Sequence, residues 1–467
     1  MSVDRLLADL IRRRPNIELL RDPEQRLAYA GDASEVEPCL PQAAVRAHHP
    51  EDVEALLQLA AHHRVPLTPR GGGTSRVGGA VPVQGGIVLA LETLNRCLSI
   101  DPQSMIAVVQ PGMITADFRA AVAEAGLFYP PDPSSLNTCT LGGNVAANAG
   151  GPSTYKYGST RDHILGMQVV NGEGQLLSLG KRTRKGVTGY DLCALMVGSE
   201  GTLGVMTELT VKLLRQPQAV ATMLVFLDDA AAIQRAIHAS WCAGVSPRCI
   251  ELVDRLALQL LRQAQPQLIP SEARAMLIVE YDGPEYGLAQ HLDLCGNAMT
   301  DAGATQVQLA RDPESRAALW QARRQLSYTL RAAARFKLSE DIVVPTPRIA
   351  DTLTLCEQLA ERFGLRMPTY GHAGDGNLHV NILWNDPAEQ ENVQAAIRAL
   401  FEQVIAWEGT LSGEHGLGVL KAPYLPLEQS ASLIDLQKRI KDLCDPQGIL
   451  NPGKVFPDAA HRFHGIC

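Results

Sequence analysis

The chain has 467 residues, 46% of them hydrophobic and 20% charged, with a formal net charge of −8. This length exceeds one ordinary core, so we expect two or three domains. The acidic balance argues against a nucleic-acid-binding surface, and we interpret the basic run at residues 181–185 as a solvated loop. No apolar run reaches the roughly 18 residues of a membrane span, and the N-terminus is predicted to be an amphipathic helix without a signal core.

The ten cysteines show no CxxC spacing. This argues against a disulfide framework, an iron–sulfur cluster and a zinc ribbon. We therefore expect mostly small buried thiols and a cytoplasmic protein.

The first half of the chain contains a glycine-rich loop. After a predicted helix from residue 50 and a strand at 65–69 comes RGGGTS, with five glycines between Gly71 and Gly79. Glycines let the backbone bend with positive φ, and consecutive N–H groups can cradle a phosphate. The third glycine of the dinucleotide fingerprint and the Walker lysine are both missing, so the loop alone leaves an ordinary tight turn open.

A second stretch, residues 140–151, consists almost entirely of small residues. Backbone can lie against a flat ring there, although a tightly packed helix is the alternative. Beyond it, the Asn171–Gly172 dipeptide predicts a hairpin between strands at 164–170 and 176–179. A second glycine-rich bend at 198–205 leads into a strand, and we place the end of the first domain near residue 217.

From residue 218 the pattern alternates between strands and helices, which predicts an antiparallel sheet with helices on one side. The helix expected over residues 318–334 carries Trp320, Arg323 and Ser327 on one face. We interpret Trp320 as core. Arg323 has a surface ion pair as its alternative role.

The stretch GHAGDGNLHVN places His372 and His379 on either side of a turn that opens a strand. On that strand His379, Asn381 and Leu383 share a face. Two such histidines can bind one metal ion if a third ligand arrives, and Glu414 in SGEHGLG is a candidate. A lone histidine on a strand is more often hydrogen-bonded structure, but the two clusters together favour a metal.

Seven motifs in order, from about residue 40 to 456, resemble one family: PRGGGTSRVGG, TLGGNVAANAGGP, YGSTRDHILGMQVV, GSEGTLGVMTELTVKL, GHAGDGNLHVN, SGEHGLG and DPQGILNPGKV. They are similar to the FAD-dependent D-2-hydroxyacid dehydrogenases of the vanillyl-alcohol oxidase / p-cresol methylhydroxylase superfamily, which include D-lactate, glycolate and D-2-hydroxyglutarate dehydrogenases. The fold implied is α+β: a PCMH-type FAD-binding domain of two lobes at 1–217, an α+β cap with an antiparallel sheet at 218–425, and a C-terminal segment, 426–467, that packs back on the FAD domain.

The resemblance implies three groups of FAD-binding residues, with Lys454 returning to the flavin beside Asn451. The pyrophosphate would be held by Arg70, Gly71, Gly72, Gly73, Thr74, Ser75, Gly78 and Gly79; the isoalloxazine and ribityl lined by Pro131, Ser135, Thr140, Gly142, Gly143, Asn144 and Gly150; and the adenosine end approached by Glu200, Gly201, Gly204 and Val205. Some members attach FAD to a histidine in the first loop. Because Thr74 and Ser75 stand there, and His62 and His63 lie earlier on a helix, we expect noncovalent FAD.

The resemblance also implies a divalent ion, usually zinc, on His372, His379 and Glu414, with His415 as the catalytic base. Arg323 matches a clamp for the substrate carboxylate, and Asn381 a further substrate contact. Relatives that oxidise D-2-hydroxyglutarate have a lysine where this chain has Ser339. Lys337 lies two residues earlier on the same face, with Ser327 on the neighbouring helix, so D-2-hydroxyglutarate and a short acid such as D-lactate or glycolate both stay open.

The reduced flavin needs an external electron acceptor, because the chain has no cysteine cluster or haem motif. Quinone, cytochrome and electron-transfer flavoprotein are the candidates, and association with a membrane would come through that acceptor. A homodimer is left open. The alternatives to a self-sufficient dehydrogenase are a metal-free FAD oxidase of another alcohol and the flavin subunit of a glycolate-oxidase-type complex.

Overall fold

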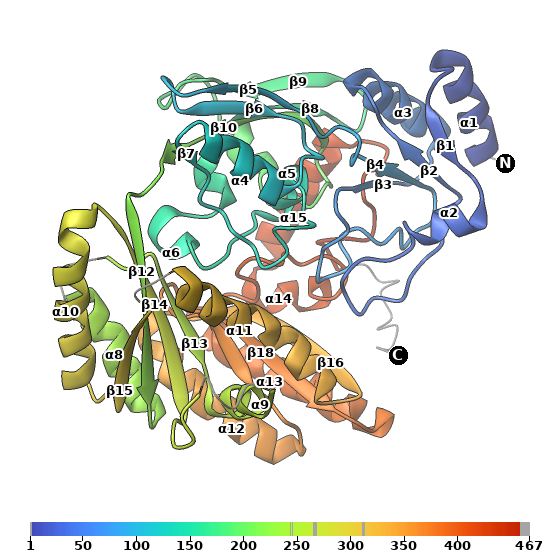
Figure 1. Cartoon of the computed structure of the whole chain (residues 1–467). Helices are drawn as coiled ribbons and strands as arrows, with labels where there is room; N and C mark the ends of the chain where they lie inside the picture. The colour runs from blue at the N-terminus through green and yellow to red at the C-terminus, as the bar shows by residue number, and fades with distance from the viewer. Residues whose placement is uncertain (1, 243, 245, 265–268, 311–312, 458–467) are drawn as a thin grey trace. The chain divides into compact units, whose positions relative to one another are not determined.

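The computed structural model describes residues 2–242, 244, 246–264, 269–310 and 313–457 (Figure 1). Residues 458–467 of the predicted C-terminal segment therefore lie outside the described part. The chain forms two compact units. Unit 1 comprises Met1–Gly150, Gly158–Gln216 and Glu414–Cys467, and unit 2 comprises Gly151–Tyr157 and Pro217–Gly413.

The first lobe of unit 1 is a four-stranded sheet covered by two helices. Leu6 and Leu10 of one helix and Leu56 of the other are fully buried in a core with Val45 and Ile87 of the sheet. The strand order is β1-β2-β4-β3, with β4 parallel to both β2 and β3. The elements are α1 (Ser2–Arg13), β1 (Glu18–Leu20), α2 (Pro23–Leu27), β2 (Ala43–Arg46), α3 (Pro50–His63), β3 (Leu67–Arg70) and β4 (Ile87–Ala90).

The second lobe is a five-stranded antiparallel sheet in the order β5-β6-β10-β8-β9. Phe118, Tyr129, Val169 and Leu209 lie in its core. The hairpin predicted from Asn171–Gly172 is confirmed, because it joins β8 to β9. The elements are β5 (Cys97–Asp101), β6 (Ile106–Val109), α4 (Thr115–Glu124), β7 (Leu127–Phe128), α5 (Leu141–Ala147), η1 (Thr160–His163), β8 (Ile164–Val170), β9 (Leu176–Gly180), α7 (Leu192–Met196), β10 (Val205–Lys212) and β11 (Leu214–Arg215).

The C-terminal stretch of unit 1 returns to the first lobe. The N–H of Leu67 donates to the Ile449 carbonyl at 2.8 Å, and the N–H of Asn451 donates to the Leu67 carbonyl at 2.8 Å. Residues 449–451 thus run beside β3, whose end begins the glycine-rich loop. The stretch contains η4 (Ala422–Tyr424), α14 (Leu425–Glu428) and α15 (Ala431–Cys444).

Unit 2 is built on a seven-stranded antiparallel sheet in the order β15-β12-β14-β13-β17-β18-β16. The antiparallel sheet and the mixed α+β class are as predicted. The strands are β12 (Ala219–Leu227), β13 (Cys249–Val253), β14 (Ala275–Gly283), β15 (Gln306–Ala310), β16 (Phe336–Val343), β17 (Thr369–His372) and β18 (Asn377–Trp384).

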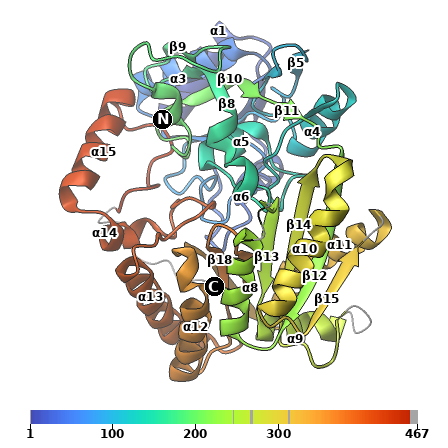
Figure 2. The same ribbon diagram turned by 90° about the vertical axis from the view of Figure 1, so that its left-hand side faces the viewer.

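Helices cover both faces of this sheet, so the prediction of helices on one side is wrong (Figures 1 and 2). Leu224 and Phe226 of β12 pack with α9 and α11, whereas Met223 points to α10 on the other face. The physical reason is that β13 and β18 are buried at every position, as in strands covered on both sides. The helices are α6 (Thr154–Tyr157), α8 (Ala230–Cys242), α9 (Arg255–Ala264), α10 (Glu285–Asp301), α11 (Pro313–Ala332), η2 (Thr346–Arg348), α12 (Ile349–Phe363), η3 (Pro387–Glu389) and α13 (Gln390–Ala406).

Candidate active site

The predicted site residues of unit 2 meet on the sheet face that α9 and α11 cover. The strand register places Glu251 of β13 opposite His372 of β17. In the next row Tyr370 stands opposite His379, which stands opposite Asp341 of β16. Because side chains on directly paired strand residues share a face, these five side chains are neighbours. The register therefore brings together two histidines and two carboxylates.

Glu251 is fully buried and joins two of these groups. One carboxylate oxygen lies 2.6 Å from Nη2 of Arg323, and the other is hydrogen-bonded to Nδ1 of His372. The Arg323 guanidinium also stacks over the Tyr370 ring, 4.5 Å from its centroid. Burial works to raise the pKa of Glu251, but the charges of His372 and Arg323 outweigh it and lower that pKa.

The two predicted metal-binding histidines are adjacent. Their ring centroids lie 5.3 Å apart, in an edge-to-face arrangement. Nδ1 of His379 lies 3.7 Å from Oδ1 of the fully buried Asp341. Asp341 in turn accepts hydrogen bonds from Asn377 Nδ2 at 2.6 Å, Ser412 Oγ at 3.2 Å and the Gly413 N–H at 3.0 Å.

The predicted third ligand and base, Glu414 and His415, begin the C-terminal stretch of unit 1. Oε1 of Glu414 lies 3.9 Å from Nε2 of His415. They are the first and second residues after Gly413 in the chain. The predicted roles of Glu414 and His415 stay predictions.

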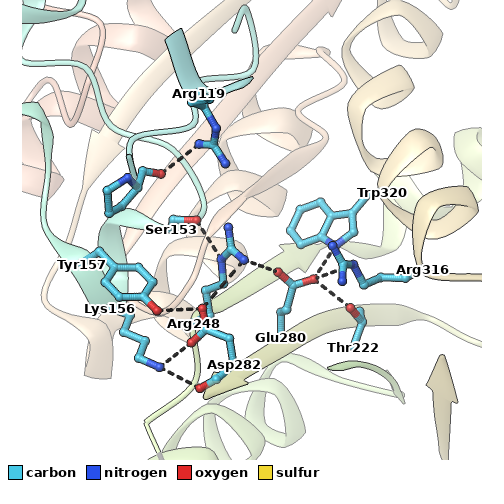
Figure 3. Close-up of polar contacts among 11 residues, drawn as sticks. Arg119, Ser153, Lys156, Tyr157, Thr222, Arg248, Glu280, Asp282, Arg316 and Trp320 are labelled. Carbon is cyan, nitrogen blue, oxygen red and sulfur yellow. Dashed lines mark hydrogen bonds and ion pairs between the residues drawn. The ribbon is translucent and has the colours of Figure 1, made fainter. Parts of the chain in front are cut away.

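Helix α11 is fixed to the sheet by a second buried carboxylate, Glu280 of β14 (Figure 3). Oε2 of Glu280 accepts from Trp320 Nε1 at 2.8 Å and from Thr222 Oγ1 at 2.8 Å, and lies 3.6 Å from Nε of Arg316. Trp320, interpreted as core, is half-buried with its indole N–H bonded. These contacts fix the helix turns that precede Arg323, so they also orient its guanidinium.

The predicted substrate contacts divide into two groups. Nζ of Lys337 lies 3.4 Å from Oγ of Ser327, one helical turn beyond Arg323. The buried Nε of Arg323 has no hydrogen-bond partner among the described residues, and its predicted contact with the substrate carboxylate stays a prediction. Nδ2 of Asn381, by contrast, donates to the backbone carbonyls of His379 at 2.9 Å and Pro368 at 3.2 Å. Asn381 thus has a structural role, and its predicted substrate contact stays a prediction.

In unit 1, the glycine-rich loop has backbone donors to spare. Within the described part of the chain, the N–H groups of residues 71–75 donate to no protein acceptor. A Cβ on Gly71 would lie 2.2 Å from Thr140 Oγ1, so only glycine fits where the loop meets the second predicted stretch. The donor set therefore fits an anion such as a pyrophosphate.

The small-residue stretch contains the packed helix that was its alternative interpretation. Thr140 caps α5 by accepting from the Gly143 N–H at 3.2 Å, and Asn144 donates to Thr115 Oγ1 at 2.8 Å. The Gly142 N–H donates to the Pro111 carbonyl at 2.7 Å. A flavin contact by this stretch stays a prediction. So do the roles of Pro131 and Gly150, which are buried, and of Ser135, whose carbonyl accepts from Thr138 and Cys139.

Asn451 joins three of the predicted cofactor segments. Its Nδ2 donates to the carbonyls of Gly79 at 3.0 Å and Glu200 at 2.7 Å, and its Oδ1 accepts from Lys454 Nζ at 2.9 Å. Glu200, at φ 52°, accepts from the Leu417 N–H at 2.8 Å, and burial raises its pKa. Gly201 follows with positive φ, while Gly204 and Val205 are buried where β10 begins.

Sequence reasoning missed Glu251 and Tyr370 as site residues and gave Asp341 no role. The available signal was chemical: Glu251 stands in the otherwise apolar strand CIELV, and a carboxylate there requires partners. Those partners, Arg323 and His372, are distant in sequence, and only the fold brings them together.

Comparison with solved structures defines the class of fold. The chain superimposes on p-cresol methylhydroxylase with substrate bound with a TM-score of 0.80, covering 99% of this chain and 98% of that one at 17% identity. The predicted PCMH-type α+β fold is therefore confirmed. Among the described residues, no helix combines the length and apolar character needed to cross a membrane.

Family comparisons then place the sequence. Residues 41–180 match the family model "FAD binding domain", and residues 216–455 match "FAD linked oxidases, C-terminal domain". The glycolate oxidase subunit GlcD of Bacillus subtilis is 38% identical, over 94% of this chain and 93% of its own. A D-lactate dehydrogenase of Anaerostipes hadrus is 33% identical over 89% of both chains. The chain belongs to the FAD-linked oxidase family, and the predicted class, an FAD-dependent dehydrogenase of the D-2-hydroxyacid type, is confirmed.

Replacing Glu251 with alanine should destabilise unit 2, because it removes the carboxylate from two buried partners. Loss of one member of a buried ion pair costs about 3–5 kcal/mol. Hydrogen exchange of peptides from β13 and β17 under urea would measure the loss. The control is Asp351→Ala, which removes an exposed pair with Arg348 and should cost about 1 kcal/mol or less. Equal effects of the two changes would contradict a structural role for Glu251.

Lys454 should titrate at unusually low pH in FAD-free protein. Burial lowers its pKa to about 8, whereas an unfolded lysine titrates near 10.4. Between pH 8 and about 10.4 the folded state holds fewer protons than the unfolded state. Burial of the charged Lys454 therefore lowers the free energy of unfolding by its full amount below pH 8, and this loss is relieved as the pH rises from 8 to about 10.4. A nearby phosphate would raise the pKa, and competitive acylation followed by mass spectrometry should detect an FAD-dependent upward shift. The exposed Lys438 serves as the control, and an unchanged Lys454 titration would remove it from the cofactor site.

Proposed function

We propose that this protein oxidises a D-2-hydroxyacid, D-lactate or D-2-hydroxyglutarate, to the 2-oxoacid with noncovalent FAD and a divalent ion, most simply zinc. The observation that supports this best is the hydrogen bond between His372 Nδ1 and the buried carboxylate of Glu251. A metal-binding histidine almost always donates its second ring nitrogen to a carboxylate or carbonyl, because that bond fixes the tautomer and the ring orientation. His372 is thus prepared to bind an ion through Nε2.

The remaining donors suit the same ion. His379 lies beside His372, with Asp341 next to its Nδ1. Glu414 is one peptide unit beyond Gly413, whose N–H is bonded to Asp341, and consecutive Cα atoms are about 3.8 Å apart. Two imidazoles and one carboxylate form a common catalytic zinc set that leaves a position for substrate.

Noncovalent FAD follows from the loop chemistry. The unused N–H groups of residues 71–75 suit a pyrophosphate, and no histidine stands among them. His63 lies on α3 with Nε2 2.8 Å from Oδ2 of Asp9. Bound FAD would supply the acceptor for two electrons.

Arg323 would bind the substrate carboxylate. Its guanidinium has five donors, and the pair between Nη2 and Glu251 and the stack on Tyr370 fix its plane. Lys337, Ser339 and Asp341 share one face of a regular strand, and Nζ of Lys337 lies 3.4 Å from Oγ of Ser327 on α11. A second carboxylate on the substrate would meet Lys337 and Ser327, whereas D-lactate would leave them to water.

His415 would take the proton of the substrate hydroxyl. The bound ion would supply Lewis acidity that lowers the pKa of that hydroxyl. His415 would accept the hydroxyl proton, and bound FAD would supply the acceptor for the C2 hydride, so that the C–O bond could become a carbonyl. With Arg323 on the carboxylate and the ion on the hydroxyl, C2 would be restricted in its orientation toward the acceptor.

A second candidate is the flavin subunit of a glycolate-oxidase-type complex. The 38% identity to a glycolate oxidase subunit favours it. In either case the electrons leave through an external acceptor, a quinone, a cytochrome or an electron-transfer flavoprotein.

Metal analysis should find about one zinc or similar ion per chain after dialysis. His379→Asn removes one of three protein ligands, so that variant should lose the ion while keeping FAD. The exposed His238→Asn variant is the matched control and should keep both. Elemental analysis of the wild type, His379→Asn and His238→Asn measures the metal content of each. Equal metal contents would exclude His379 as a ligand.

His415→Asn should slow flavin reduction by roughly 10²–10⁴-fold, the usual contribution of a general base. The measurement is anaerobic stopped-flow bleaching of the bound FAD by D-lactate and D-2-hydroxyglutarate, with L-lactate as the enantiomer control. The FAD content of His415→Asn should equal that of the wild type. The exposed control variant, His62→Asn, should match the wild type in both FAD content and rate of flavin reduction. Undiminished bleaching would remove His415 from the reaction. If the purified wild-type chain is not bleached by either acid but is bleached by glycolate, the glycolate-oxidase alternative replaces the proposal.

A further inference from the structure

One surface loop of unit 1 stands apart from the rest of this acidic chain. It joins β9 to α7, and all ten residues from 181 to 190 are exposed. They include Lys181, Arg182, Arg184 and Lys185 and no acidic residue, in a chain whose net charge is −8. We call residues 181–190 the basic loop.

None of the four cations of the basic loop forms an ion pair with a described residue. The contacts found are from Thr183 Oγ1 to the Lys185 carbonyl at 2.9 Å and from Arg184 Nη2 to Met105 Sδ at 3.8 Å. A Cβ built on Gly186 or Gly189 would meet nothing within 4 Å. The loop thus extends into solvent, with Arg184 in contact with Met105 of unit 1.

The same loop exposes two apolar side chains more completely than other large hydrophobic residues of the described chain. Val187 is 98% exposed and Tyr190 is 95% exposed. Leu192, just beyond the loop, is 43% exposed. Single exposed hydrophobic residues are common, but two within four positions, next to four unpaired cations, form a surface of mixed character.

We propose that the basic loop binds the surface of an anionic phospholipid bilayer. Lys and Arg would meet the lipid phosphates, while Val187 and Tyr190 would enter the boundary between headgroups and acyl chains, where amphipathic tyrosine is favoured. Each basic residue near such a surface strengthens binding by about fivefold, so four supply several hundredfold. A standard protein–protein interface involves roughly 20–30 residues a side, more than this loop offers, which favours a lipid surface over a folded acidic partner.

The test is cosedimentation of the FAD-loaded full-length protein with vesicles. Binding is expected to phosphatidylcholine mixed with phosphatidylglycerol and not to phosphatidylcholine alone, and it should be lost in 1 M salt, where the screening length is about 3 Å. Replacing Lys181, Arg182, Arg184 and Lys185 with serine should weaken binding by about 100-fold or more. The control replaces four exposed arginines elsewhere with serine, Arg5, Arg13, Arg255 and Arg324, and should retain it. Equal loss in both variants, or no binding by wild type, overturns the proposal.

A second variant tests the apolar contact directly. In Tyr190→Trp, the introduced indole fluorescence should shift to the blue on anionic vesicles and be quenched by brominated lipid. Binding without either change would mean that another surface touches the bilayer. Sedimentation velocity without vesicles tests whether the loop instead binds a second copy of the chain. If the wild type is a dimer and the four-serine variant is a monomer, the loop forms a dimer interface and the lipid proposal is wrong.

Discussion

The candidate site depends on a buried carboxylate that contacts an arginine and a histidine at once. Glu251 is fully buried, and a charge so placed is tolerated only when both oxygens have strong partners. Arg323 and His372 are those partners, and they come from a helix and a strand that are far apart in sequence. A group that would bind the substrate carboxylate and a group that would bind the metal are therefore oriented by one side chain.

The sheet register makes this arrangement possible. Residues at alternate positions of four neighbouring strands face α11, so a shift of one residue in β17 would turn both Tyr370 and His372 to the opposite face. Glu280 adds a second constraint, because its bonds to Trp320 and Thr222 fix α11 in the turns before Arg323. Apolar packing sets the layers, and these two carboxylates set the position of the helix within them.

Much of this was predictable from local patterns. The turn and strand around His379, the hairpin at Asn171–Gly172 and the shared helix face of Arg323 and Ser327 all follow from short-range periodicity. The glycine loop could be read as an anion cradle because its chemistry is local. The role of Glu251 could not be read in this way, since it depends on long-range pairing of β13 with β17. The prediction of helices on one side of the sheet was wrong. Strands such as β13 and β18 are buried at every position, and such strands need a covering layer on both faces.

Zinc affinity tests the central claim, that Glu251 organises the metal histidine and the carboxylate clamp together. The measurement is competition of the FAD-loaded wild type and Glu251→Gln against a chromophoric chelator, with the fold of each checked by circular dichroism. Loss of the carboxylate behind a metal-binding histidine usually weakens metal binding by 10–100-fold, and that weakening is the result expected here. A folded Glu251→Gln protein with wild-type zinc affinity would contradict the account.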